Sequence, residues 1–285
     1  MSIVLKDVTY TYMAKTPYEK NAIKNINVEI QRGEFVGIIG HTGSGKSTLL
    51  QHLNGILKPT TGIVSVEGQD LNVKGEAAQN ARRSVGMVFQ YPEHQLFEET
   101  VYDDIAFGPR NIGVEETGVD LRVKKAMEFV GLDYELFAKR TPFQLSGGQM
   151  RRVAIAGVIA LEPAYLILDE PSAGLDPRGR DEIFGQIIKL HKSTGITVVL
   201  VSHNMEDVAR MANRLIVMNA GEISLDGSPV EIFRDCQAQL KKSGVDVPPL
   251  TVLMNKFNQR GLAVDHTVVA IDDAVDSVLT AVRRG

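Results

Sequence analysis

The chain has 285 residues, of which 44% are hydrophobic and 23% charged, as in a globular protein that buries a full core in one or two domains. Its net charge of −4 lacks the basic excess of a nucleic-acid binder, and its single cysteine, Cys236, excludes an internal disulfide and suits a reducing cytoplasm. Neither a signal-peptide pattern nor an apolar run of membrane-spanning length is found. The first elements are predicted to be strands at residues 3–10 and 26–30, where β-forming residues cluster.

Three tyrosines accompany these first strands. Tyr10, Tyr12 and Tyr18 are interpreted as lying in a polar stretch between the two strands. Tyr12 is a candidate for stacking on an adenine ring, a contact worth about 1–3 kcal/mol. Alternatively, it is an ordinary aromatic residue at a sheet edge, and the residues alone leave both interpretations open.

A phosphate-binding loop is predicted between a strand at 35–39 and a helix that begins near residue 47. The sequence there fits Gly-x4-Gly-Lys-Ser/Thr, whose backbone amides and helix dipole attract phosphate groups. Lys46 is expected to contact the β- and γ-phosphates, and the Ser47 hydroxyl to ligate Mg²⁺. The predicted nucleoside triphosphate loop comprises Gly40, His41, Thr42, Gly43, Ser44, Gly45, Lys46, Ser47 and Thr48.

Two more strands and a helical insertion follow. Residues 63–68 and 85–89 predict strands, and the second ends at Gln90, whose amide can join a Mg²⁺ ligand sphere or donate to a phosphate. Residues 91–140 change to helical patterns, with Leu121, Met127 and Val130 expected on one apolar face.

A second anion-binding helix start is predicted after Leu145. Ser146 is a good N-cap, and Gly147 and Gly148 let the backbone approach a ligand closely. A capped helix with a purely structural role would show the same residues, so this segment alone leaves both possibilities open.

Two carboxylates end the predicted strand at residues 165–168. At the carboxyl end of a parallel strand, Asp169 is suited to hold the Mg²⁺ shell and Glu170 to polarise an attacking water. The alternative, two solvated loop carboxylates, explains their position less well. A turn-rich loop at 171–177 and a helix at 181–192 follow.

The last central strand, 196–201, is followed by His203, which is placed to reach a γ-phosphate. A hairpin is expected at 215–225. Beyond residue 228, helices are predicted near 230–242, 250–260 and 271–283, with Pro248-Pro249 separating the first two. This tail carries no catalytic constellation and is expected to serve association.

Taken together, these motifs resemble the ATP-binding subunits of ABC transporters. The resemblance implies an α/β P-loop NTPase fold with a RecA-like core, an antiparallel β subdomain and an inserted helical subdomain at about 91–160. It divides the chain into an ABC domain, 1–228, and a C-terminal helical extension, 229–285. It also implies that ATP is closed over by the signature segment of a second subunit. The residues assigned by the resemblance are Tyr12 for adenine stacking, Lys46, Gln90, Glu170 and His203 for catalysis, Ser47, Gln90 and Asp169 for Mg²⁺ (Asp169 through water), Ser146, Gly147, Gly148 and Gln149 for the partner's ATP, and Asp176 in the D-loop.

A narrower likeness is to energy-coupling factor (ECF) transporters, which import vitamins and other micronutrients. The stretches 91–109 and 150–157 resemble the ECF type, closest to its second, A′ ATPase. This implies a peripheral protein on the cytoplasmic face of the membrane, pairing with an unlike ATPase. A membrane T component, received by residues 91–109, would connect both to a substrate-binding S component. Ser172, where the family often has Thr, is a conservative departure.

Two other functions remain as alternatives. One is the ATPase of a conventional, cobalt or nickel ABC importer. The other is a soluble ABC ATPase acting on nucleic acid or ribosomes. Two features of the sequence disfavour it: the net negative charge, and the lack of inserted coiled coils or a second cassette. A non-catalytic partner ranks last because every catalytic position holds a competent residue.

Overall fold

The computed structural model describes residues 1–265, 268 and 271–284. Its central sheet has six strands in the order β10-β9-β3-β8-β7-β6, parallel except for the β9-β10 hairpin. Strands β3, β6, β7 and β8 are short, mostly apolar runs buried along their whole length, as parallel strands covered by other layers must be. The predicted strands are confirmed with these bounds: β3 Phe35–Ile39, β6 Val85–Val88, β7 Tyr165–Asp169, β8 Thr197–Val201, β9 Arg214–Asn219 and β10 Glu222–Gly227.

A second, antiparallel sheet has the order β2-β1-β4-β5. In β1, Ile3 and Leu5 point inward and pair with β2 and β4 on either side. Tyr10 and Tyr12 also lie within β1, so the expectation that they follow the strand in a connecting stretch was wrong; polar and aromatic residues continue its alternation. The strands are β1 Ser2–Tyr12, β2 Lys20–Gln31, β4 Thr61–Val66 and β5 Gln69–Asp70.

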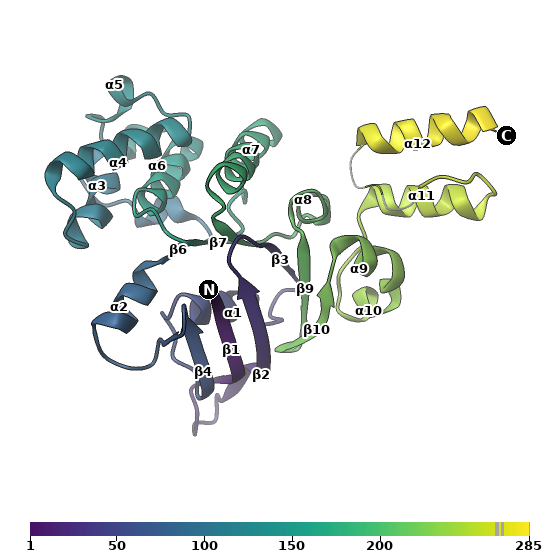
Figure 1. Ribbon diagram of the computed structural model, residues 1–285, viewed down its shortest axis with the longest axis horizontal. Helices are drawn as coiled ribbons and strands as arrows, with labels where there is room; N and C mark the ends of the chain where they lie inside the picture. The colour runs from purple at the N-terminus through teal and green to yellow at the C-terminus, as the bar shows by residue number, and fades with distance from the viewer. Residues whose placement is uncertain (266–267, 269–270, 285) are drawn as a thin grey trace.

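Helix α1 (Lys46–Leu53) lies between the two sheets (Figure 1). Its Leu49, Leu50 and Leu53 belong to the same buried cluster as inward residues of both sheets. This packing holds the start of α1, and the loop before it, at a fixed place beside β3. Helix α2 (Glu76–Arg83) follows β5 and leads into β6.

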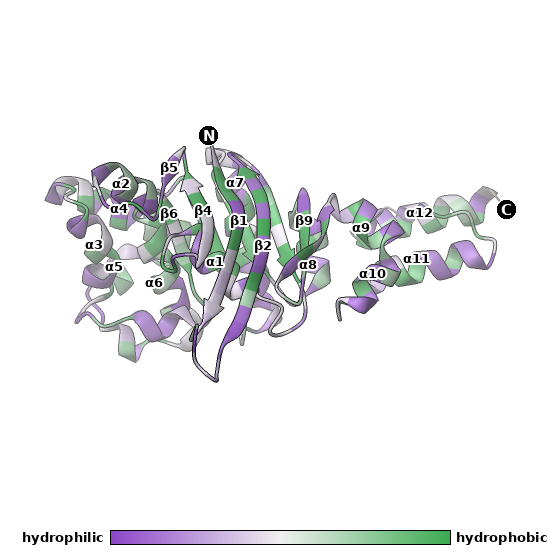
Figure 2. Cartoon of the chain, turned by 90° about the horizontal axis from the view of Figure 1, so that it is seen from below, coloured by the Kyte–Doolittle hydropathy of each residue, from purple (hydrophilic) through white to green (hydrophobic). Residues whose placement is uncertain are grey.

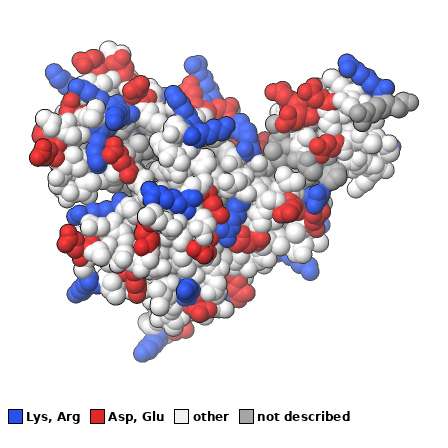
Figure 3. All heavy atoms as spheres, in the orientation of Figure 1, with Lys and Arg blue, Asp and Glu red and all other residues white. Residues whose placement is uncertain are grey.

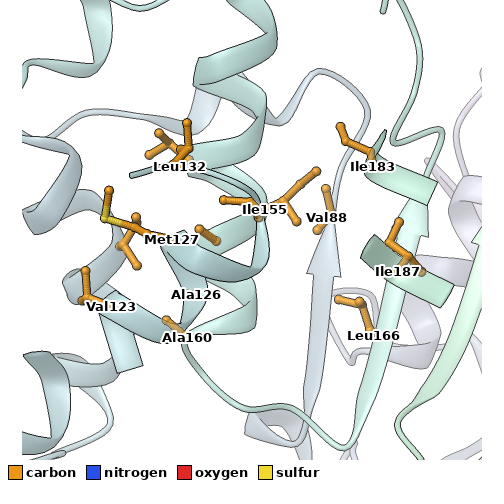
Figure 4. Close-up of a cluster of buried hydrophobic side chains, with 14 of the residues drawn as sticks. Val88, Val123, Ala126, Met127, Leu132, Ile155, Ala160, Leu166, Ile183 and Ile187 are labelled. Carbon is orange, nitrogen blue, oxygen red and sulfur yellow. The ribbon is translucent and has the colours of Figure 1, made fainter. Parts of the chain in front are cut away.

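The predicted helical insertion is present between β6 and β7. Its inner side shares one buried cluster with β6, β7 and α7, seen in the close-up of Figure 4. Helix α4 buries Val119, Val123 and Met127, whereas Leu121 is 53% exposed; the predicted apolar face was therefore wrong at Leu121, which points away from the helix's buried side. The elements are η1 Pro92–Gln95, α3 Val101–Asn111, α4 Glu116–Phe129, α5 Tyr134–Phe137, η2 Pro142–Gln144 and α6 Gly147–Ile159.

The remaining helices cover the sheet and form the extension. Helix α7 (Pro177–Thr194) begins earlier than predicted, because Asp176 caps it. The expected single helix at 230–242 is two helices that meet at Cys236. The helices are α8 Met205–Met211, α9 Pro229–Asp235, α10 Gln237–Lys242, α11 Pro249–Gln259 and α12 Ile271–Arg284.

The extension packs in two places. Helices α9 and α10 share a buried cluster with β3, α8 and β9. Helices α11 and α12 instead share a small cluster of their own and project from the rest of the molecule (Figure 2). In the part of the chain that the structure describes, no helix combines the length and the apolar character needed to cross a bilayer.

Candidate nucleotide-binding site

The loop between β3 and α1 requires glycine at two positions. Gly40 has φ +155° and a Cβ there would lie 2.4 Å from the Met218 carbonyl oxygen. Gly45 has φ +105°, and its Cβ would lie 2.6 Å from the Ala22 carbonyl oxygen. Gly43 borders open space instead. The backbone therefore packs tightly on one side and leaves the other side open to a ligand.

Lys46 lies inside the curve of this loop. Its side chain is buried, and Nζ donates to the carbonyl oxygens of Gly40 at 2.8 Å and His41 at 3.0 Å. Burial lowers the pKa of Lys46, while the carboxylates of Glu170 and Asp169 oppose that shift. A cation held at the first turn of a helix, among backbone amides, gives the loop the positive field that a phosphate chain needs.

Asp169 and Glu170 follow one another at the end of β7. Asp169 is buried, which raises its pKa, whereas a hydrogen bond with Ser47 and the charge of Lys46 favour its ionised form. Glu170 has φ +51°, a left-handed conformation that costs a non-glycine residue about 1–2 kcal/mol. Its amide donates to the Val201 carbonyl oxygen at 3.0 Å, which holds this turn against β8.

The Glu170 carboxylate is bonded on both oxygens. His203 Nε2 lies 2.6 Å from Oε1, and Gln90 Nε2 donates to Oε2 at 3.2 Å. These three residues follow β8, β6 and β7, which are neighbours in the sheet, so their carboxyl ends meet at one edge. The structure thus brings the side chains of Gln90, Glu170 and His203 together at this edge of the sheet, near the charge of Lys46.

The residues expected to hold Mg²⁺ fit that ion. The Ser47 hydroxyl, the Gln90 amide oxygen and the Asp169 carboxylate offer oxygen ligands, which Mg²⁺ prefers together with substrate phosphates and water. Within the described residues no group of three or more His, Cys, Asp or Glu side chains is placed to bind a metal. Ser47, Gln90 and Asp169 offer fewer oxygens than an octahedral Mg²⁺ takes, so this donor set suits an ion that arrives with phosphate and water ligands. Ser44 Oγ, in the loop itself, is buried without a hydrogen-bond partner.

Tyr12 borders the outer side of the same loop. It is 38% exposed, and its hydroxyl lies 3.3 Å from Thr48 Oγ1 on α1. Sequence reasoning missed Lys20 and Ala22, which β2 brings to this place; no local motif marks them. Together these residues line a pocket formed by Tyr12, Lys20, Ala22, Gly43, Gly45, Lys46, Ser47 and Thr48.

The signature residues lie on a different surface. Ser146 caps α6, accepting from the Gln149 amide at 3.3 Å, while Gln149 Oε1 accepts from the Ser146 amide at 3.0 Å. Asp176 caps α7 through the Gly179 amide at 2.7 Å. Ser146, Gly148, Gln149 and Asp176 line one pocket, which shares no lining residue with the phosphate-loop pocket. The two predicted anion-binding segments therefore lie at separate pockets of one chain, and Gly147 begins the helix at the second.

Arg151 connects α6, η1 and the loop before Asp176, a role that the sequence alone did not indicate. It is 3% exposed, donates to both Glu93 oxygens at 3.1 and 2.8 Å, and also donates to the Ala173 carbonyl oxygen. Burial would raise the pKa of Glu93, but the bonds and charge of Arg151 hold it below its usual value. Arg151 thereby ties α6 to η1 and to the loop that precedes Asp176.

The extension reaches the phosphate loop as well. Gly244, after α10, has φ +64°, and a Cβ at this residue would lie 3.2 Å from the Cβ of His41. The His41 ring interacts locally, with Nδ1 2.8 Å from the Thr42 carbonyl oxygen. The C-terminal extension thus meets the phosphate loop at His41.

Comparison with known proteins identifies the class. A family model described as ABC transporter matches residues 23–173. An energy-coupling factor transporter ATP-binding protein EcfA2 from Clostridium perfringens is 53% identical over 284 residues, covering 100% of this chain and 99% of the relative. A protein of the same name from Acetivibrio thermocellus is 50% identical over 284 residues, covering 100% of both chains. The chain therefore belongs to the ABC transporter family.

Solved structures agree with this assignment. The structure of cbiO1 from Clostridium perfringens, part of the ABC transporter complex cbiONQ, has a TM-score of 0.73 and 37% identity, covering 89% of this chain and 98% of that one. A dimeric structure of the ATP-binding cassette MJ0796 bound to ADP and Pi has a TM-score of 0.72 and 31% sequence identity, and the match covers 80% of this chain and 98% of that one. The predicted fold, ATP binding and ATP hydrolysis coupled to transport are confirmed, and within the family the chain groups with the ATP-binding subunits of ECF transporters.

Proposed function

We propose that this chain powers the uptake of a vitamin or another micronutrient as one of two ATPase subunits in an ECF transporter. The observation that carries the proposal is the separation of its two anion-binding surfaces. The phosphate-loop pocket has Lys46 in its lining and Glu170 nearby, whereas the Ser146 pocket has the second helix start and a carboxylate, Asp176, that is already engaged in capping α7. Each site is complete only when a second subunit supplies Ser146–Gln149 and Asp176.

Within a subunit, the roles follow from the contacts. Lys46 and the loop amides would bind the β- and γ-phosphates, and Tyr12 would stack on the adenine. Mg²⁺, held through Ser47, Gln90 and water on Asp169, would neutralise phosphate charge. Glu170 would orient the attacking water and accept its proton. His203 and Gln90 both contact the Glu170 carboxylate in this structure. When ATP binds, His203 would leave that carboxylate to contact the terminal phosphate, and Gln90 would leave it to contact the ion.

The test is Glu170→Gln in the assembled transporter. We expect ATP hydrolysis to fall by about 10²–10⁴, the contribution of a positioned acid–base group, while ATP still binds. Glu162→Gln is the matched control, because Glu162 also has a left-handed backbone, φ +52°, and lies outside the pocket. Hydrolysis at the wild-type rate in Glu170→Gln would refute the assignment of the base.

The membrane T component is proposed to bind at residues 91–109. There Phe97 and Phe107 are 59% and 44% exposed and pack edge to face, with ring centroids 4.9 Å apart. An exposed aromatic pair of this kind suits a partner helix that presents apolar side chains. Phe97→Ser should release the membrane subunits on detergent purification, whereas Leu121→Ser, on the exposed side of α4, should retain them.

The second ATPase is proposed to contact α12. Ile271, Val275, Leu279 and Val282 recur on one face of this helix and are all at least 48% exposed, while Ala274 and Ala281 pack inward. An apolar stripe on the exposed side of a helix is typical of a helix–helix interface. Leu279→Lys should weaken pairing with the second ATPase in size-exclusion chromatography; unchanged pairing would contradict this role.

Co-purification distinguishes the alternatives. We expect the chain to sit on the cytoplasmic face of the membrane with T and S components, and not on nucleic acid. On the face seen in Figure 3, acidic and basic side chains are interspersed and form no continuous basic stripe. Recovery of ribosomes or DNA would favour the soluble-ATPase alternative, and recovery of a conventional, cobalt or nickel permease would favour the other importer types.

A further inference from the structure

Four residues form a closed ring of contacts on the Tyr12 side of the pocket, through three aromatic side chains and through both the hydroxyl and the backbone carbonyl of Thr48. Tyr12 bonds Thr48 through their hydroxyls at 3.3 Å. One helical turn on, the Thr48 carbonyl oxygen lies 2.7 Å from His52 Nδ1. The His52 ring meets Tyr10 edge to face at 4.9 Å, and Tyr10 meets Tyr12 edge to face at 4.8 Å.

His52 is the most deeply buried of these four residues. It is 0% exposed, and its Nε2 is buried without a hydrogen-bond partner. A polar ring in such a place is usually costly, and leucine would fill a similar volume without leaving a nitrogen unpaired. What the imidazole adds is its bond to the α1 backbone and its aromatic contact with Tyr10.

The ring joins two parts of the molecule that are distant in sequence. Tyr10 and Tyr12 belong to β1 in the antiparallel sheet, and Thr48 and His52 belong to α1, which starts at Lys46. Tyr12 is the last residue of its strand, where little else restrains a side chain that is 38% exposed. The contacts therefore fix the Tyr12 ring relative to the helix that carries Lys46 and Ser47.

We propose that Tyr10, Thr48 and His52 are positioning residues that hold the Tyr12 ring at a set distance from the phosphate loop, so that the base and the phosphates of ATP bind as one unit. The inference rests on the proposed stacking of adenine on Tyr12. Immobilising a side chain before binding lowers the entropic cost of binding, so loss of the ring of contacts should weaken ATP binding about 2- to 10-fold. Neither Tyr10 nor His52 lines the phosphate-loop pocket, so replacing either should leave the groups that bind phosphate in place.

The experiment compares ATP with inorganic triphosphate in the assembled transporter. For His52→Leu and Tyr10→Leu we expect KM for ATP to rise about 2- to 10-fold, with kcat unchanged and the affinity for inorganic triphosphate unchanged. Tyr10→Phe keeps the aromatic edge and should restore the wild-type KM. Tyr18→Leu is the matched control, because Tyr18 is 79% exposed and lies outside the pocket.

Two results would overturn the proposal. One is an unchanged KM for ATP in both leucine variants. The other is an equal loss of affinity for ATP and inorganic triphosphate, which would show that the phosphate loop itself was damaged. Tyr12→Ala tells apart a failure of the positioning role and a failure of the proposed adenine site. If Tyr12→Ala leaves the affinity for ATP unchanged, adenine does not stack on Tyr12. If Tyr12→Ala lowers the affinity for ATP but not for inorganic triphosphate, while the leucine variants change neither, only the positioning role is wrong.

Discussion

Replacing Arg151 by methionine should destabilise the protein far more than the same change one residue later. Arg151→Met keeps the apolar stem but leaves Glu93, whose side chain is 15% exposed, without its ion-pair partner. Breaking a buried pair from one side costs about 3–5 kcal/mol. Arg152 is the matched control, since it lies on the same helix and pairs with Glu182 at side-chain exposures of 24% and 41%. Such a partly exposed pair contributes about 0–1 kcal/mol.

The assay is urea unfolding of the purified chain, followed by far-ultraviolet circular dichroism. We expect a clearly lower urea midpoint for Arg151→Met and a midpoint near wild type for Arg152→Met. Adding Glu93→Gln to Arg151→Met removes the unpaired charge, so the double variant should recover part of the lost stability. Equal midpoints for the two arginine variants would show that the buried ion pair does not hold α6, η1 and the loop before Asp176 together.

Three further outcomes follow from the structure. Gly40→Ala should destabilise the protein clearly, because its Cβ would lie 2.4 Å from the Met218 carbonyl oxygen, whereas Gly43→Ala, whose Cβ would meet no protein atom within 4 Å, should cost only about 1 kcal/mol of unfolding free energy; urea titration tests both. Met127→Ala should cost about 2–5 kcal/mol of unfolding free energy and Leu121→Ala less than about 0.5, by urea titration. Burial lowers the pKa of His52 below its usual value of 6.5, so below that pH the unfolded chain binds a proton that the folded protein excludes. The free energy of unfolding should therefore decrease as the pH is lowered through this range, and it should decrease less steeply in His52→Leu.

Sequence reasoning recovered the elements whose signals are local. The apolar runs at 35–39 and 165–168 are short strands buried on both faces, and the glycine loop and Asp169-Glu170 stand at strand ends where function is expected. It failed where a helix phase was read from three scattered residues, as at Leu121. A helix turns about 100° per residue, so the buried face of α4 follows Val119 and Val123 instead.

Contacts between residues far apart in the sequence could not be predicted, because no local sequence pattern indicates them. Glu93 and Arg151 are 58 residues apart, and each alone resembles a surface charge. Tyr10 and His52 likewise meet only because β1 and α1 pack together. Such pairs depend on how elements pack, which neither local propensity nor hydrophobic periodicity specifies.

Because α9 and α10 pack on the central sheet and Gly244 approaches His41 of the phosphate loop, these inner helices are part of the ATPase and not an appendage. Ile232, Phe233 and Leu240 bury Ile39 and Val217 of the central sheet. A chain ending at residue 228 would expose those side chains to water, at about 1.5–3 kcal/mol for each, and would strip the cover from His41. The shortest piece expected to fold and bind ATP therefore runs through Val247, and removal of the projecting helices α11 and α12 should spare the fold while weakening the proposed pairing with the second ATPase.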